Sequence, residues 1–180
     1  MNKTNKLVKI SVVAAIYIVV TIALGSLSYW GPIGFRLSEM LNFLTFIDPF
    51  YIISLTIGCA IANFYSFSII DVFVGSFATL LATYAMWKTR KMVISMIWPV
   101  LGSAIIAEEL HILYKVPFFY TFFTQAVGEL AVMVIGYFVF KKIFRNSAFL
   151  ERIKIKDNNQ KLKDIQSKAE KIRKTKLRNI

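Results

Sequence analysis

Glu129 is the residue of this chain whose position most strongly indicates a binding function. It lies near the middle of an apolar run over residues 118–140. Thr121 and Gln125 precede it at intervals of four residues, which places the three side chains on one face of a helix. An ionisable side chain inside such a segment is costly and usually marks a ligand site or a substrate path. We therefore predict that Glu129 faces a polar pocket.

Other polar side chains stand near the ends of apolar stretches, on the same predicted side of the membrane. Glu39 follows Ser38 at the start of one stretch, where a carboxylate can also stabilise a helix amino terminus. Arg36 is either an interfacial charge or the partner of Glu39. Helix-end residues such as Asn63 and Asp71 are either solvated capping groups or pocket groups. The polar candidate set is Arg36, Glu39, Asn63, Asp71, Glu108, Gln125 and Glu129.

Six apolar stretches would position these residues in a membrane. A crossing needs about twenty mostly apolar residues. The chain is 57% hydrophobic with a mean hydropathy of +0.59, which argues against a soluble domain. The second stretch is short, so it is tilted, partial or continuous with the loop before it. The sequence thus predicts an all-α bundle of six transmembrane helices, at 7–27, 37–47, 50–66, 69–87, 92–110 and 118–140.

The charges divide the chain into two regions. Residues 1–140 carry eight Lys or Arg against six acids, and residues 141–180 carry fourteen against four. Basic clusters precede the first stretch, separate the fourth from the fifth and follow the sixth, and such clusters favour the cytoplasmic side. We predict cytoplasmic termini, a substrate-binding membrane domain over 1–142 and a basic cytoplasmic tail over 143–180, helical or disordered.

The two termini each allow a second interpretation. The tail has a narrow apolar stripe of Leu162, Ile165, Ala169 and Ile172. It is either a solvated extension or a segment attached to anionic lipid head groups, and we expect no nucleic acid beside a membrane domain. The first stretch imitates a signal peptide. Its apolar run is longer than the apolar region of a usual signal peptide. We therefore predict that this segment is not cleaved and stays as the first helix.

Signals for catalysis and metal binding are weak. The sequence has no Gly-x-x-x-x-Gly-Lys-Ser/Thr phosphate loop, so the chain does not power itself with ATP, and no Gly-x-Ser-x-Gly elbow. It has one His and one Cys, whereas zinc sites usually take three or four such ligands. Glu108 and His111 form half of a di-iron motif that needs a second His. We predict a non-enzyme with no catalytic residue, metal or cofactor.

The first stretch also carries a face of small residues, Ser11, Ala14 and Ala15. Small residues let helices approach closely in lipid. They either pack inside the bundle or form a docking face for a second membrane protein. Because this face carries no charge, we take it as the candidate docking face.

Several ordered motifs resemble the queuosine-precursor transporter family (QueT type). The run GPIGFRLSE at 31–39 is similar to that family's GPIQFRVSE loop, and GCAIAN at 58–63 to its GCxIAN helix end. The run DVFVGSFATL at 71–80 resembles its DxxxGTLATL helix, with Ser-Phe in place of Thr-Leu at 76–77. Glu109 and Glu129 match its acidic positions. The resemblance covers roughly residues 7–142 and excludes the tail.

That family is similar to the substrate-binding S components of energy-coupling factor (ECF) transporters. The resemblance implies a six-helix bundle in the bacterial plasma membrane, with an outward-facing site for one small nutrient. It implies as partners two ATPase subunits and a transmembrane coupling protein, docked at Ser11, Ala14 and Ala15. The implied cargo is a 7-deazaguanine precursor of queuosine.

The chemistry of such a base suggests a role for each candidate residue. A guanine-like edge presents two adjacent donors, which the carboxylate of Glu129 or Glu108 can accept. The ring oxygen needs a donor, an aminomethyl cation needs a carboxylate, and the flat ring suits an aromatic lid. The candidates are Asn63, Gln125 or Arg36 for the donor, Asp71 for the carboxylate, and Trp30, Tyr29 and Phe35 for the lid.

Two alternatives stay open at this point. An S component for another vitamin or nucleobase would have the same fold. A small intramembrane enzyme acting on lipid or isoprenoid would share the apolar bundle. Co-purification with coupling and ATPase subunits would separate a transporter from an enzyme.

Overall fold

The computed structural model describes residues 3–29, 33–66, 68–89 and 91–155. Within these ranges the chain forms helices and short connections, and no β-strand occurs there. The elements, in chain order, are α1 (Lys3–Ala23), α2 (Gly25–Ser28), the 3-10 helix η1 (Leu37–Phe46), α3 (Tyr51–Asn63), α4 (Ile69–Thr89), α5 (Met92–Ser95), α6 (Ile97–Tyr114), α7 (Phe118–Ile143) and α8 (Ser147–Ile153).

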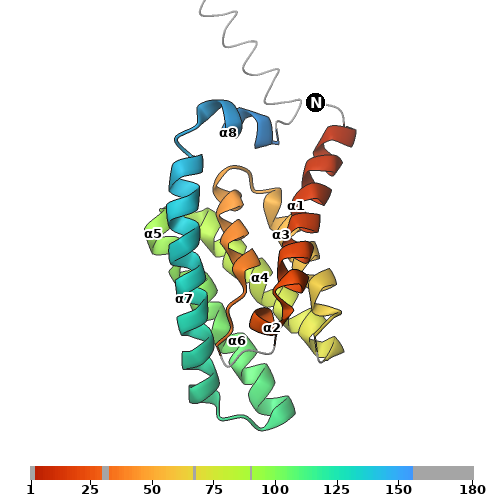
Figure 1. The fold of residues 1–180 in the computed structure, drawn as a ribbon, viewed down its shortest axis with the longest axis vertical. Coiled ribbons are helices and arrows are strands. Elements are labelled where there is room, and N and C mark those ends of the chain that lie inside the picture. Colours follow the sequence, from red (N-terminus) through yellow and green to blue (C-terminus); the bar gives the residue numbers. More distant parts are fainter. Residues whose placement is uncertain (1–2, 30–32, 67, 90, 156–180) are drawn as a thin grey trace, which may run out of the picture.

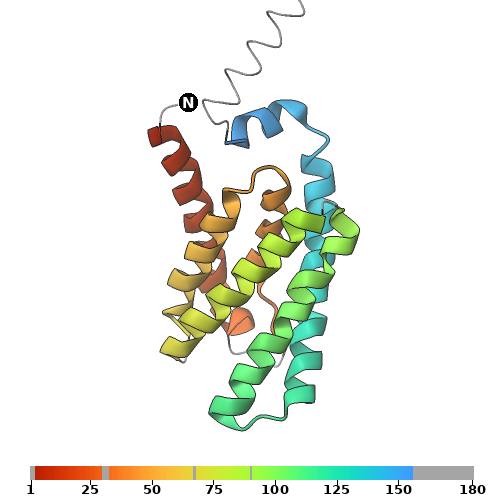
Figure 2. The ribbon, with the colours of Figure 1, turned by 180° about the vertical axis from the view of Figure 1, so that it is seen from behind.

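The helices surround η1, which lies inside the bundle (Figure 1). Neighbouring pairs are α1 with α3, α3 with α4, α4 with α6, and α6 with α7. Figure 2 shows from behind how α4 runs between α3 and α6. Because η1 contacts α1, α3, α4 and α7, its apolar side chains enter the core. Phe43 is fully buried there with Tyr17, Leu55 and Met133.

Four helical segments are long and apolar enough to cross a membrane: Thr4–Ala23, Ile69–Thr89, Met92–Tyr114 and Phe118–Ile143. The 13 residues of α3 and the 10 of η1 each extend about 20 Å, which is short of a hydrocarbon core of about 30 Å. The predicted all-α membrane bundle is thus confirmed, whereas six full crossings are not. The second and third predicted spans form shorter elements, because an Asp-Pro turn at 48–49 and the bend after Asn63 limit α3.

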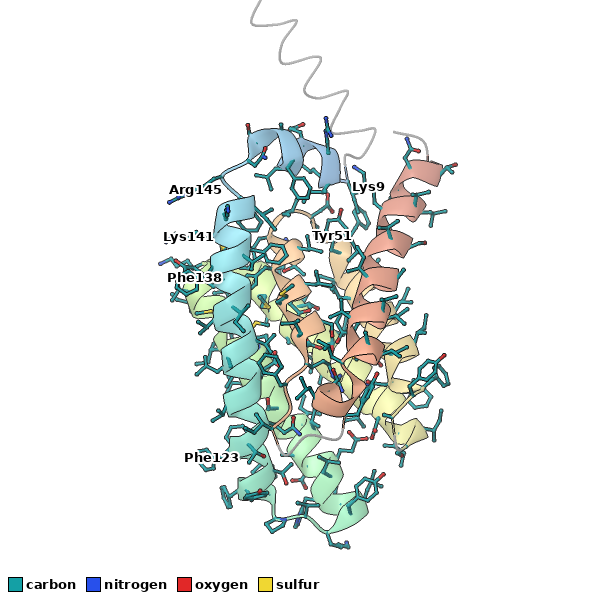
Figure 3. All side chains as sticks on the ribbon, in the orientation of Figure 1. Lys9, Tyr51, Phe123, Phe138, Lys141 and Arg145 are labelled. Atoms are coloured by element: carbon teal, nitrogen blue, oxygen red, sulfur yellow. The ribbon has the colours of Figure 1, made fainter. Side chains whose placement is uncertain are left out.

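The outward faces of the bundle are apolar. Phe73 on α4 is 71% exposed, and Phe119 and Phe138 on α7 are 72% and 65% exposed. Figure 3 shows Phe123 and Phe138 pointing away from the bundle. A soluble monomer rarely exposes apolar surface on this scale, so these faces suit a lipid environment.

A proline divides the segment between Met92 and Tyr114. Pro99 has no N–H to donate to the carbonyl oxygen of Ser95, four residues earlier. The segment accordingly divides at Met96 into α5 and α6.

Both ends of the described chain lie at the same end of the bundle, which we call the α8 end (Figure 1). Lys9 and Tyr51 donate hydrogen bonds to main-chain carbonyl oxygens of residues 152–154. Asp48 Oδ2 accepts a hydrogen bond from the N–H of Ile155 at 3.0 Å. The first part of the predicted tail therefore packs against the bundle.

Basic side chains gather at the α8 end. Lys9, Lys141 and Arg145 are found there (Figure 3), and such clusters favour the cytoplasmic side. The cytoplasmic orientation of both termini stays a prediction. The apolar stripe predicted within 162–172 lies outside the described residues.

Candidate ligand-binding site

Two adjoining polar cavities lie among α4, α6 and α7, with η1 beside the first and α3 beside the second. The inner cavity has a volume of about 70 Å³, and the outer cavity, nearer the start of α4, has about 80 Å³. A water needs about 10–15 Å³ of such space, so each cavity has room for several. Five residues line both cavities, so the two cavities are neighbouring parts of one polar region. These are Ser28, Arg36, Gly75, Ile106 and Gln125.

Unpaired polar atoms concentrate in this space. Seven buried side-chain oxygens of the described residues have no hydrogen-bond partner, and five of them belong to cavity-lining residues. Buried polar groups are normally paired, and each unpaired one costs about 1–3 kcal/mol. Their clustering indicates that water or a polar ligand in the cavities supplies the missing partners. The five atoms are Ser28 Oγ, Asn63 Oδ1, Asp71 Oδ1, Glu109 Oε1 and Glu129 Oε1.

Glu39 is a carboxylate held by the protein itself. The 3-10 geometry of η1 has three residues per turn, which stacks Asn42 directly beyond Glu39. The Asn42 amide donates to Oε2 of Glu39. The Tyr17 hydroxyl and the Thr79 hydroxyl, the latter at 3.4 Å, donate to Oε1. Both oxygens are thus engaged, and Glu39 shapes the inner cavity from a fixed position.

Glu129 has the opposite character. Its side chain is 8% exposed and lines the inner cavity from α7, but its Oε1 has no partner among the described residues. Arg36 lines the same cavity. Its guanidinium donates to Cys59 Sγ at 3.7 Å and lies 5.6 Å from the centre of the Tyr29 ring. A cation and an open carboxylate therefore border one small polar space, which suits a ligand with both acceptors and donors.

Two glycines make room for the amide side chains of the site. A Cβ on Gly75 would lie 2.2 Å from Asn63 Nδ2, and one on Gly34 would lie 1.4 Å from Gln125 Oε1. With this room, Asn63 Nδ2 donates to the carbonyl oxygen of Asp71 at 2.8 Å. Both glycines appear in the sequence analysis only within the resembling motifs, where neither is assigned a role.

Gly75→Ala is expected to lower the free energy of unfolding by about 1–3 kcal/mol, because the new methyl group displaces the Asn63 amide. Gly102→Ala is the matched control. Gly102 also lies in a helix and lines the inner cavity, but no neighbouring atom lies within 4 Å of the place its new methyl group would take. That control should keep or slightly raise stability, because Ala favours helix over Gly. Thermal unfolding in detergent checks both. Equal unfolding curves for the two variants would refute the role of Gly75.

Of the seven polar candidates and Trp30, six residues line the cavities. Glu39 and Glu129 line the inner one, Asn63 and Asp71 the outer one, and Arg36 and Gln125 both.

Glu108 and Trp30 are the other two predicted site residues. Glu108 lies on the exposed side of α6 and does not line either cavity. Its neighbour Glu109 is 7% exposed and lines the outer cavity, because successive helical residues point about 100° apart. We therefore assign the acidic position on α6 to Glu109. Trp30 lies outside the described residues.

Some cavity residues give no signal in the sequence. Ser28 and Ser103 are short hydroxyl side chains, and Thr79 stands out only within a resembling motif. Such residues are common on any membrane helix. Only the packing of α2, α4 and α6 shows that these three line a cavity.

The predicted docking face divides into two parts. Ser11 and Ala15 are exposed on α1. Ala14 is 7% exposed, and a Cβ on Gly58 would lie 3.2 Å from its carbonyl oxygen. Ala14 therefore packs against α3, which leaves Ser11 and Ala15 as the surface open to another protein.

The chain is similar in sequence to known transport proteins. A family model described as QueT transporter matches residues 7–145. The queuosine precursor transporter QueT of Lactococcus lactis subsp. cremoris (strain MG1363) is 38% identical over 159 residues, which cover 79% of this chain and 94% of that protein. No solved structure matches the chain. The matched range contains every residue that lines the two cavities.

Proposed function

Because this chain belongs to the QueT transporter family, we propose that it captures a queuosine precursor at the cell surface for uptake. One observation carries this proposal. The carboxylate of Glu129 has an open oxygen inside a polar cavity, within a bundle whose outer faces are apolar. A small, flat, polar molecule fits such a site better than a lipid substrate does.

The proposed ligand is a 7-deazaguanine base in the inner cavity. Its guanine-like edge carries two adjacent N–H donors, which the Glu129 carboxylate accepts as a pair. The ring oxygen accepts a hydrogen bond from the Gln125 amide or the Arg36 guanidinium. Arg36 also offsets the charge of Glu129 in a region where an unpaired charge would be costly.

The proposal extends to the source of energy. The sequence has no phosphate loop for ATP, so ATP-driven uptake requires other subunits. The chain acts as the S component of an ECF-type importer in the bacterial plasma membrane, with both termini cytoplasmic. Its partners are a transmembrane coupling protein and two ATPase subunits.

Uptake of a radiolabelled 7-deazaguanine base tests this function. Cells without their own uptake would express the chain alone, with all partners, or with partners whose ATPase sites are inactivated. The proposal predicts accumulation only with the complete active set. Accumulation by the chain alone would refute the ECF mechanism, and no accumulation by a complex that hydrolyses ATP would refute the cargo.

The exposed small residues of α1 are the proposed contact with the coupling protein. Ala15→Leu is expected to abolish co-purification of the coupling protein, because a bulky side chain keeps the two helices apart. Ligand affinity should not change, since Ala15 does not line a cavity. Ala131→Leu, at an exposed alanine of α7, is the matched control and should retain the partner. Loss of the partner in both variants, or in neither, would exclude α1 as the specific contact.

A further inference from the structure

The segment that follows α7 folds back over the α8 end of the bundle (Figure 1). Asn146 caps α8 at the start of this segment, because its side chain accepts a hydrogen bond from the N–H of Phe149 at 3.1 Å. α8 ends at Ile153, and Lys154 then has an extended conformation with φ −59° and ψ 131°. Residues 152–155 thereby reach α1 and the turn before α3.

The bundle binds residues 152–155 through their main chain. Lys9 on α1 donates to the carbonyl oxygens of residues 152 and 154, the latter at 2.9 Å. The Tyr51 hydroxyl on α3 donates to the carbonyl oxygen of residue 153. Both side chains lie at this end of the bundle (Figure 3). Asp48 Oδ2 accepts from the N–H of Ile155 at 3.0 Å. Three side chains thus pair main-chain groups of four consecutive residues, which is the way an extended peptide is recognised.

One side chain of the segment enters the core. Ile155 is 4% exposed and belongs to the same buried cluster as Phe43 and Tyr51. The side chains of Arg152 and Lys154 are exposed. The bundle therefore requires an apolar side chain at position 155 and accessible main-chain groups before it. In peptide recognition, main-chain hydrogen bonds supply affinity and a side-chain pocket supplies specificity.

We propose that Lys9, Asp48 and Tyr51 form a peptide-binding site for this chain's own residues 152–155. The bound segment is a latch that ties the end of α7 to the amino-terminal part of α1. It opens without unfolding the bundle, because a segment held by few contacts opens locally. None of these residues lines either cavity, so the latch is separate from the ligand site. The latch segment also lies beyond residue 145, where the match to the QueT family model ends.

Hydrogen exchange of the purified full-length chain in detergent, resolved to single amides by mass spectrometry, tests the latch. In the wild-type chain, the amide of Ile155 should exchange at least about 10-fold more slowly than in an unstructured peptide, because it is bonded to Asp48. Ile155→Asp should remove this protection, since a charged side chain does not enter an apolar core. It should also speed exchange in the first three turns of α1 about 10-fold, because the latch no longer holds Lys9.

Two further variants define the site. Lys9→Met keeps an apolar side chain of similar length but removes the donor to two carbonyl oxygens, so it should also speed exchange at position 155. Lys154→Ala is the matched control, because that residue is bound through its carbonyl oxygen while its side chain is exposed. This control should keep the wild-type exchange pattern. Slow exchange in α4 shows that a variant retains its bundle.

The measurement has clear contrary results. An unprotected amide at position 155 in the wild-type chain would overturn the peptide-binding site. Protection that survives both Ile155→Asp and Lys9→Met would do the same. Faster exchange at position 155 without any change in α1 would overturn the role of the segment as a latch. If one variant loses its fold, the other variant and the wild-type chain still decide the question.

Discussion

Glu129→Gln is expected to lower the affinity for a 7-deazaguanine base about 100-fold or more. The glutamine offers one acceptor where the carboxylate offers two, and its NH₂ group faces a donor of the base. Losing hydrogen bonds to a charged group costs about 1.5–3 kcal/mol each, and every 1.4 kcal/mol is a factor of ten. The ligand-free chain should unfold at an unchanged temperature, because Glu129 Oε1 has no partner to lose among the described residues.

Calorimetric titration and thermal unfolding of the same preparation check this prediction. Glu108→Gln is the matched control, since it makes the same chemical change on the exposed side of α6. That control should bind the base as the wild-type chain does. Retained affinity in Glu129→Gln would show that Glu129 does not recognise the base edge.

Glu39→Ala is expected to destabilise the ligand-free chain by about 3–5 kcal/mol. The substitution leaves the Tyr17 hydroxyl and the Asn42 amide without their acceptor inside the bundle, whereas the Thr79 hydroxyl keeps Cys59 Sγ at 3.3 Å. Each unsatisfied buried group costs about 1–3 kcal/mol, and removing one member of a buried network usually costs several.

Thermal and chemical unfolding in detergent measure this effect, with Glu108→Ala as the exposed control. Tyr17→Phe should cost less than Glu39→Ala, because it removes one of the three donors and leaves the carboxylate its other two. An unchanged unfolding temperature in Glu39→Ala, together with lost binding, would move Glu39 from the scaffold to the ligand contacts.

These two carboxylates show what the sequence can predict about the site. Both stand out because they are charges in apolar surroundings, and that signal is local. The difference between them depends on the donors around them. Tyr17 and Thr79 reach Glu39 from α1 and α4, and no spacing within the sequence brings those two hydroxyls to one oxygen.

The adjacent pair Glu108 and Glu109 shows a second limit. They are the same residue type in the same apolar stretch. Only the rotation of α6 about its axis decides which of the two faces inward. The face with Gly102, Ile106 and Glu109 lines the cavities, whereas the pocket residue proposed from the sequence is Glu108. Gly102 lies seven residues before Glu109 and therefore on the same helix face. This small residue is the feature of the sequence that could have indicated that Glu109 faces inward.

The 3-10 helix is the part of the fold that the sequence does not predict. The apolar stretch at 37–47 and its short length are evident from the sequence. Its residue pattern, however, fits an α-helix as well as a 3-10 helix. The winding matters because three residues per turn align Glu39 with Asn42. Long 3-10 helices are uncommon because their hydrogen-bond geometry is poorer, so tertiary contacts with four neighbouring helices must stabilise η1.

Binding of a queuosine precursor in the two cavities is best tested by one titration. The purified chain would be titrated with 7-deazaguanine precursors, with guanine and riboflavin as controls. We predict tight binding of a 7-deazaguanine base and none of riboflavin. Failure of a demonstrably folded chain to bind any 7-deazaguanine, or tight binding of riboflavin instead, would contradict the proposed function.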